Sequence, residues 1–185
     1  MQDFLPFSQM LQHETKETIF RFLEENNIPY RAFSHPKTDE LAKKLENDAA
    51  AGIFGAAHCK NLVLSNRQKT KFYLLTMPFE KRFSTGPVSR QMASGRLSFA
   101  EQGILEEILH TASGMVSPLE LIFDEKKEIA FSMDRDLKEA ARLCFHPSDD
   151  TCTVVLENAD FFEKFVPALG IDVNFVTIDG GTHER

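Results

Sequence analysis

Several features that often identify a protein's chemistry are missing from this sequence. It has no tryptophan and only three cysteines, Cys59, Cys144 and Cys152, which lack the CxxC spacing. An odd, sparse set of this kind argues for reduced thiols in a cytosol and against a disulfide framework. Neither a GxxxxGKS/T nor a GxGxxG motif occurs, so the use of ATP or of a dinucleotide has no support. The six histidines are scattered and no HExxH motif is present, so we expect no metal and no other cofactor.

Long apolar runs are also missing. No stretch approaches the ~20 apolar residues that a membrane-spanning helix needs, and residues 1–5 include no basic region of a secretory signal. We therefore expect a cytoplasmic protein with no membrane partner. The 185 residues, 42% hydrophobic and 26% charged, have an ordinary globular balance. We expect a single domain over residues 1–185 that buries roughly 70% of its unfolded surface and needs no disulfide or metal to fold.

Positive charge is concentrated in one part of this acidic chain. The formal net charge is −7, yet residues 60–96 carry +7 and the rest of the chain −14. The basic residues of the segment are Lys60, Arg67, Lys69, Lys71, Lys81, Arg82, Arg90 and Arg96, against one acid, Glu80. Such asymmetry can produce a local positive face that attracts phosphate groups. The alternative is a chance clustering of charges on solvated surfaces.

Hydrophobic periodicity and turn residues predict the order of the secondary structure. Helices are expected at residues 14–27, 39–47, 87–93, 99–110, 135–141 and 160–169. Strands are expected at 28–33, 61–64, 71–76, 143–145, 151–156 and 171–177, with a further hairpin over 119–133. Because the strands come as hairpins with helices between them, we expect an α/β fold with a mixed sheet, not a doubly wound one.

A lysine and a glycine-containing loop are the first two candidates for a functional site. Lys60 opens the apolar strand 61–64, where its ammonium group can reach a phosphate or a developing oxyanion. A solvated lysine at a strand edge gives the same pattern. In the second segment, flexible Gly114 and rigid Pro118 enclose a loop whose backbone N–H groups can approach a ligand, and Ser117 adds a hydroxyl. An ordinary turn is the alternative for this loop.

A histidine in an extended segment is the third candidate. His146 precedes a proline, which can hold the imidazole at the edge of a pocket as a proton shuttle or hydrogen-bond donor. A structural histidine is the alternative. Because Cys144 and Cys152 are close in sequence, a cysteine–histidine nucleophilic pair also has to be considered. On a regular strand Cys144 and His146 would lie about 7 Å apart, which disfavours direct proton transfer.

Taken in order along the chain, these segments resemble the YbaK/prolyl-tRNA editing superfamily of aminoacyl-tRNA deacylases. The similar segments are 60–64 (KNLVL), 72–76 (FYLLT), 96–100 (RLSFA), 114–118 (GMVSP), 145–147 (FHP) and 151–154 (TCTV). The resemblance runs from about residue 28 to residue 169. Within the superfamily the chain is most similar to the stand-alone prolyl-tRNA editing proteins of the ProXp-ala and PrdX type. The resemblance implies a mixed sheet curled into a partial barrel with flanking helices.

The resemblance also implies hydrolysis of the ester that joins a wrong amino acid to the 3′ end of tRNA, without a metal or a covalent nucleophile. Lys60 would hold the terminal phosphate or the ester carbonyl, and Asn61 would orient the substrate amine or ribose. The backbone from Gly114 to Pro118, with Ser117, would position the ester and the attacking water, which the neighbouring ribose hydroxyl helps to activate. His146 would line the pocket. The remaining residues expected to contact the substrate are Met115, Val116 and Thr151.

Two departures from the family pattern bear on which amino acid is removed. Residues 148–150 (SDD) follow the His-Pro pair where relatives often carry asparagines, and Leu119-Glu120 replace an aromatic–glycine pair. The first expectation is Ala-tRNA(Pro), with Cys-tRNA(Pro) or another small residue as the alternative. The expected partners are tRNA, contacted at its aminoacylated 3′ end, and prolyl-tRNA synthetase. Two other classes stay open: a non-catalytic tRNA- or synthetase-associated binding module, and a thiol hydrolase.

Overall fold

The structure is a computed structural model that describes residues 7–179. Its helices are α1 (Phe7–Glu25), α2 (Leu41–Ala50), α3 (Thr85–Gln91), α4 (Gln102–Leu109), α5 (Asn158–Asp160) and α6 (Val166–Leu169). Two 3-10 helices, η1 (Pro118–Phe123) and η2 (Arg135–Glu139), and the π-helical segment η3 (Phe161–Phe165) complete the helical part. Its strands are β1 (Arg31–Ser34), β2 (Ala56–Asn66), β3 (Phe72–Pro78), β4 (Leu97–Phe99), β5 (Ile129–Asp134), β6 (Arg142–Phe145), β7 (Cys152–Glu157) and β8 (Asn174–Val176).

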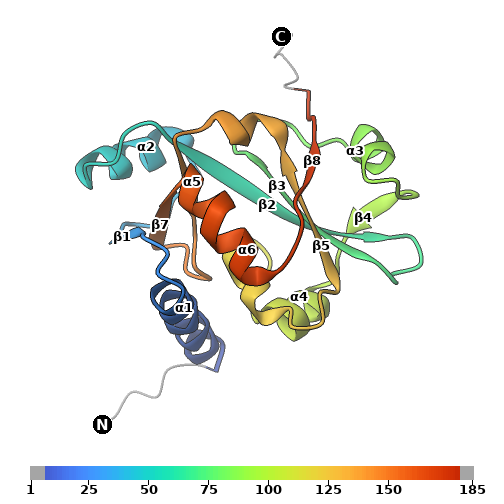
Figure 1. Cartoon of the computed structure of the whole chain (residues 1–185), viewed down its shortest axis with the longest axis horizontal. Helices are drawn as coiled ribbons and strands as arrows, with labels where there is room; N and C mark the ends of the chain where they lie inside the picture. The colour runs from blue at the N-terminus through green and yellow to red at the C-terminus, as the bar shows by residue number, and fades with distance from the viewer. Residues whose placement is uncertain (1–6, 180–185) are drawn as a thin grey trace.

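The strands form one mixed sheet that does not close on itself (Figure 1). Its order is β1-β7-β6-β2-β3-β5-β8, with β4 pairing separately with β2. The β2–β6, β3–β5 and β5–β8 pairs are parallel, and the other pairs are antiparallel. The expected α/β fold, a mixed sheet curled into a partial barrel with flanking helices, is therefore confirmed.

The long strand β2 has an incompletely paired edge. Strand β3 lies along one edge of β2. On the opposite edge, β6 pairs with β2 only as far as His58, and β4 pairs with it only from Leu64 onward. Between these two pairings the described residues place no strand beside β2. This open stretch contains Lys60 and Asn61, so the topology itself leaves room for a ligand beside them.

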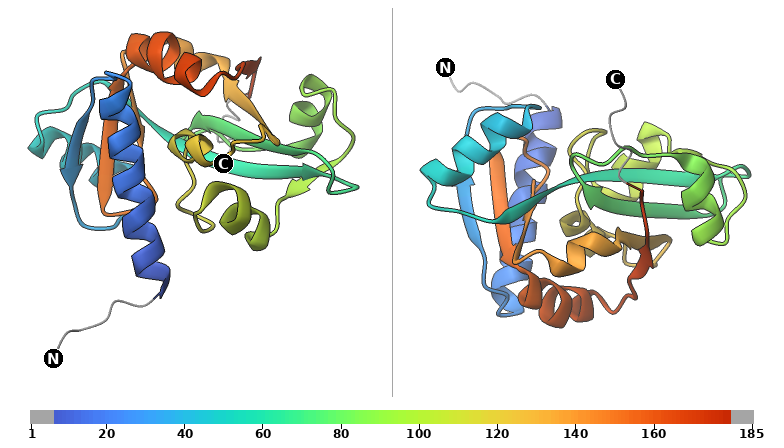
Figure 2. Two further views of the ribbon diagram at one scale, coloured as in Figure 1. Left: turned by 60° about the horizontal axis from the view of Figure 1, so that its bottom comes forward. Right: turned by 90° about the horizontal axis from the view of Figure 1, so that it is seen from above.

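The helices cover the outside of the sheet and bury two main groups of apolar side chains. Helix α1 lies beside β1 and β7 (Figure 2), and its Ile19 and Leu23, spaced four residues apart, are fully buried. A second group, which includes Val88 of α3 and Leu75 of β3, lies near the other end of the sheet. None of the described helices combines the length and apolar character that crossing a bilayer requires.

The structure confirms most of the expected elements and moves several boundaries. The β2–β3 and β6–β7 hairpins form as predicted. The last helical segment ends at Gly170, whose φ of 63° is the left-handed conformation that favours glycine. The helix predicted at 99–110 starts later, at Gln102, because Phe99 belongs to β4 and pairs with Leu64.

The hairpin predicted over residues 119–133 is wrong. Its second arm is β5, which pairs in parallel with β3, while its first arm is the 3-10 helix η1. A capping box begins η1: the Ser117 hydroxyl accepts a hydrogen bond from Leu119 N, and the Glu120 carboxylate accepts one from Ser117 N. Pro118 occupies the first helical turn, where its missing N–H costs nothing. This S-P-L-E signature was readable in the sequence and predicts a helix start.

Candidate active site

A pocket of about 410 Å³ lies at the open stretch of β2. It is lined by Lys37, Thr38, Asp39, Lys44, Cys59, Lys60, Asn61, Phe79, Ser113, Gly114, Met115, Val116, His146 and Asp150. These residues come from the β1–α2 connection, α2, β2, the end of β3, the loop before η1 and the β6–β7 loop. Segments far apart in sequence therefore converge on one cavity.

Six of the nine residues expected to form the site line this pocket. They are Lys60, Asn61, Gly114, Met115, Val116 and His146. Ser117, Pro118 and Thr151 do not line it. Ser117 and Pro118 are buried in the start of η1, and the exposed Thr151 donates a hydrogen bond to Asp149 at 2.6 Å.

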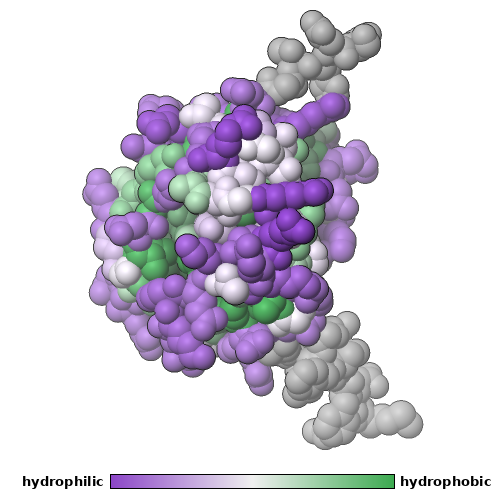
Figure 3. Space-filling model, turned by 90° about the vertical axis from the view of Figure 1, so that its right-hand side faces the viewer, coloured by the Kyte–Doolittle hydropathy of each residue, from purple (hydrophilic) through white to green (hydrophobic). Residues whose placement is uncertain are grey.

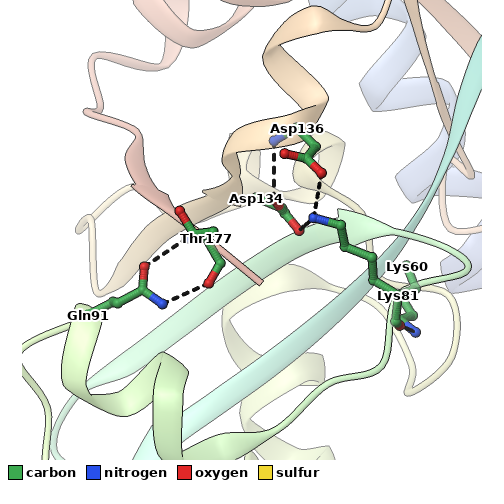
Figure 4. A network of polar contacts seen from close by, with 6 residues as sticks. All are labelled: Lys60, Lys81, Gln91, Asp134, Asp136 and Thr177. Carbon is green, nitrogen blue, oxygen red and sulfur yellow. Dashed lines mark hydrogen bonds and ion pairs between the residues drawn. The ribbon is translucent and has the colours of Figure 1, made fainter. Parts of the chain in front are cut away.

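Lys60 is held in place through the segment that follows β3. Its ammonium group donates a hydrogen bond to the backbone carbonyl of Lys81. Lys81 is itself fixed, because its own ammonium contacts Asp134 at 2.8 Å and Asp136 at 2.7 Å (Figure 4). Burial lowers the pKa of Lys60, and the more distant Glu80 only partly opposes this effect. Lys60 thus presents a partly desolvated ammonium to the pocket.

Asn61 is oriented by its neighbour across the β2–β3 hairpin. The Thr76 hydroxyl donates a hydrogen bond of 2.7 Å to the Asn61 side-chain oxygen, and the two residues are direct register partners. Because this oxygen already accepts a hydrogen bond, the side-chain N–H groups of Asn61 are the ones that can donate to a ligand.

A buried network supports the loop on the opposite side of the pocket. Glu120 is fully buried and accepts hydrogen bonds from Ser117 N at 2.6 Å and from the Ser117 hydroxyl at 2.8 Å. The Ser148 hydroxyl donates to the other Glu120 oxygen at 3.0 Å and makes a second hydrogen bond with the Thr111 hydroxyl at 2.8 Å. Burial raises the pKa of Glu120 to about 7, although these hydrogen bonds oppose the shift. Gly114, with a φ of 86°, gives this loop its turn.

His146 contributes a neutral imidazole. Burial, assisted by Lys44 and the neighbouring histidines, lowers the pKa of His146 to about 4. Its ring lies edge-on to that of His35, with 5.7 Å between the centroids. His35 is fixed in turn by the Thr153 hydroxyl, 2.8 Å from its Nε2. At neutral pH His146 can therefore line the pocket and accept or donate one hydrogen bond, but it adds no charge.

Sequence reasoning missed the pocket wall formed by the β1–α2 connection and α2. Lys37, Asp39 and Lys44 all line the pocket, and Lys37 forms an ion pair of 2.6 Å with Asp150 of the β6–β7 loop. The polar run HPKTDE at residues 35–40 was a readable loop signal, but only the tertiary fold brings it to β2.

The cysteines are poorly suited to act as nucleophiles. Burial raises the pKa of Cys59, which lines the pocket, and the pKa of Cys144 and Cys152, which do not. Each thiol is therefore held in its unreactive protonated form. Within residues 7–179, Cys144 joins Asp48 and His58 in the one cluster whose ligand atoms, all within 4.8 Å, suit a metal ion. The Asp48 carboxylate and His58 Nε2 already share a hydrogen bond of 2.7 Å there.

Comparison with known proteins agrees with this geometry. The family model of the aminoacyl-tRNA editing domain matches residues 37–164, which include every pocket residue. The chain is 28% identical to "Prolyl-tRNA editing protein ProX" of Acetoanaerobium sticklandii over 159 residues, or 85% of this chain and 93% of that protein. It is 30% identical to "Prolyl-tRNA synthetase associated domain-containing protein 1" of Mus musculus over 127 residues, covering 66% and 74%.

The protein therefore belongs to the aminoacyl-tRNA editing domain family. Solved structures agree on the fold. One named "putative trans-editing enzyme for prolyl tRNA synthetase" superposes with a TM-score of 0.66 at 17% identity, covering 90% of this chain and 98% of that one. One relative that covers most of this chain, ProX, is named as a prolyl-tRNA editing protein.

Proposed function

We propose that this protein hydrolyses the 3′ aminoacyl ester of mischarged tRNA, acting in trans in the cytoplasm, with Ala-tRNA(Pro) as its first substrate. One observation carries the proposal: Lys60, Asn61, the 114–116 loop and His146 line a single pocket beside the open edge of β2. These groups suit the binding and polarisation of an ester, and the pocket offers no activated thiol.

In this mechanism the protein positions the ester and stabilises developing negative charge. The Lys60 ammonium polarises the ester carbonyl, and backbone groups of the Gly114 loop hold the ester and the attacking water. The N–H groups of Asn61 orient the ribose or the amino group. The neighbouring ribose hydroxyl of the substrate activates the water. Because the aminoacyl ester is already reactive, proximity and oxyanion stabilisation can supply several kcal/mol each.

Ser117, Pro118 and Thr151 have a supporting role in this proposal. Ser117 ties the loop to buried Glu120, and Pro118 starts η1 directly behind the loop. Thr151 contacts Asp149 in the β6–β7 loop, which also supplies His146 and Asp150 to the pocket. The three residues thus fix the pocket wall and leave contact with substrate to their neighbours.

The basic segment of residues 60–96 is a candidate surface for the tRNA. Figure 3 shows the face that carries the end of the β2–β3 hairpin, α3 and β4, and hydrophilic side chains cover much of it. Acids already pair with two of its lysines: Lys69 with Glu101, and Lys81 with Asp134 and Asp136. Arg67, Lys71, Arg90 and Arg96 are exposed. Their charge supports attraction of the phosphate backbone, with the salt dependence that such contacts bring.

A deacylation panel tests the proposal. Purified protein is mixed with tRNA(Pro) charged with Ala, Cys, Ser or Pro, and the loss of each ester is followed. We expect hydrolysis of Ala-tRNA(Pro) and protection of Pro-tRNA(Pro), because a small pocket can exclude the larger cognate residue. A preference for Cys would select the alternative substrate. Binding of tRNA without hydrolysis of any ester would instead identify a binding module, and prolyl-tRNA synthetase is the partner to test then.

A further inference from the structure

Two lysines that line the pocket, one buried and one half-buried, have no carboxylate in contact among residues 7–179. Four described lysines are not exposed: Lys16, Lys44, Lys60 and Lys81. Lys16 pairs with Asp149 at 2.8 Å, and Lys81 pairs with Asp134 and Asp136. In the described part of the chain, neither Lys44 nor Lys60 forms an ion pair with a carboxylate.

Lys44 is the more deeply placed of these two. The residue is 8% exposed and extends from α2 so that its ammonium lies 5.5 Å from the centroid of the Phe79 ring, which also lines the pocket. Lys60 approaches the same cavity from β2 and already donates to the Lys81 carbonyl. The Lys44 ammonium thus lies beside a ring face and the cavity, and a buried cation of this kind is costly without an anion in contact with it.

Acidic residues act on Lys44 only at longer range. Asp39, Asp150 and Asp48 attract its charge, yet desolvation is the larger effect and the pKa of Lys44 is lowered. Desolvation also acts on Lys81 and Lys16, but the carboxylates that touch these two ammonium groups outweigh it and raise the pKa of both. The contrast shows that no carboxylate touches the Lys44 ammonium directly, although Asp39 and Asp150 also line the pocket.

We propose that Lys44 forms a phosphate subsite of this pocket and binds the 5′-phosphate of the terminal nucleoside of the substrate. The inference rests on the proposed function and deepens it. Lys60, which already donates a hydrogen bond to the Lys81 carbonyl, then contacts the ester carbonyl. Each lysine thus binds a different group of the substrate: Lys44 the phosphate and Lys60 the ester. Charge-assisted hydrogen bonds from an ammonium to a phosphate oxygen are among the stronger contacts that a protein makes.

Paired minimal substrates test this division. The full-length protein hydrolyses 3′-O-alanyl-adenosine and the same compound carrying a 5′-phosphate, and kcat/KM is measured for both. We expect the wild type to prefer the phosphorylated compound by about tenfold or more. Lys44→Met should lose this preference while still hydrolysing the compound without phosphate, and Lys44→Arg should keep most of it. Lys43→Met is the matched control, since Lys43 is the neighbouring exposed lysine of α2 and pairs with Glu40.

Binding measurements separate this proposal from the proposed function. Titration calorimetry compares AMP with adenosine on the wild type, Lys44→Met and Lys43→Met, with thermal unfolding to show that each variant is folded. Loss of the preference for AMP in Lys44→Met alone supports the phosphate subsite, even if no ester is hydrolysed. If the wild type does not prefer the phosphorylated ligand, or if Lys44→Met keeps the preference, the subsite is refuted, whatever the deacylation panel shows.

Discussion

The Ser148 hydroxyl donates a hydrogen bond of 3.0 Å to Oε1 of Glu120, and both residues are fully buried. These two residues belong to residues 148–150 and 119–120, the two segments where the sequence resemblance predicts a departure from the family pattern. In the structure these two segments are in direct contact, because this hydrogen bond joins the loop after His146 to the start of η1. Together they form a continuous wall behind the pocket.

Glu120 should make stability depend on pH. Its pKa is about 7 in the folded protein and 4.5 in the reference state, so the folded protein holds an extra proton between these values. The free energy of unfolding should therefore fall as pH rises from about 4.5 to 7, by a few kcal/mol at most. Urea unfolding of the wild type and Glu120→Gln across this range measures the effect. A stability difference between them that does not change with pH would show that Glu120 does not titrate in this way.

Asp134 should contribute more to stability than Asp136, although both contact Lys81. Asp134 is completely buried, while the Asp136 side chain is 65% exposed. Asp134→Ala leaves Lys81, only 12% exposed, without its buried partner and should cost about 3 kcal/mol. Asp136→Ala should cost less than about 1 kcal/mol. Chemical denaturation measures both. Because Lys81 positions Lys60, deacylation by Asp134→Ala should also be slower, and equal effects of the two substitutions would contradict this picture.

The cysteines should be dispensable for activity. Burial keeps the thiols of Cys59, Cys144 and Cys152 protonated, so none is a ready nucleophile. Single serine variants should retain deacylation within about threefold, apart from losses that track a lowered stability. Rates measured on correctly folded variants check this. Complete loss of activity in one folded variant would instead support a thiol hydrolase.

Local signals and long-range packing contributed differently to what the sequence could predict. The Lys60-Asn61 strand, the 114–118 loop and the His146-Pro147 pair are compact motifs, and their order along the chain led to the correct family. The start of η1 was also encoded locally, in the Ser117 to Glu120 capping box. The two apolar runs 121–123 and 129–131 predict a hairpin, whereas residues 118–123 form η1 and β5 pairs with the distant β3.

The pocket wall from α2 could not be predicted in the same way. Nothing in the local sequence distinguishes Lys44 from its exposed neighbour Lys43. Their difference arises because α2 packs toward Phe79 and the open edge of β2, which buries one lysine and leaves the other in solvent. Contacts of this kind depend on the assembled sheet, so they are visible only in the structure.

The rate of Ala-tRNA(Pro) deacylation by Lys60→Ala tests the central claim most directly. Single-turnover rates are compared among the wild type, Lys60→Ala and Lys127→Ala, an exposed lysine outside the pocket. Removal of one oxyanion-stabilising group typically lowers the rate by about 100-fold or more. We expect a loss of that size for Lys60→Ala with unchanged thermal unfolding, and wild-type activity for Lys127→Ala. Full activity of a folded Lys60→Ala protein would contradict the account.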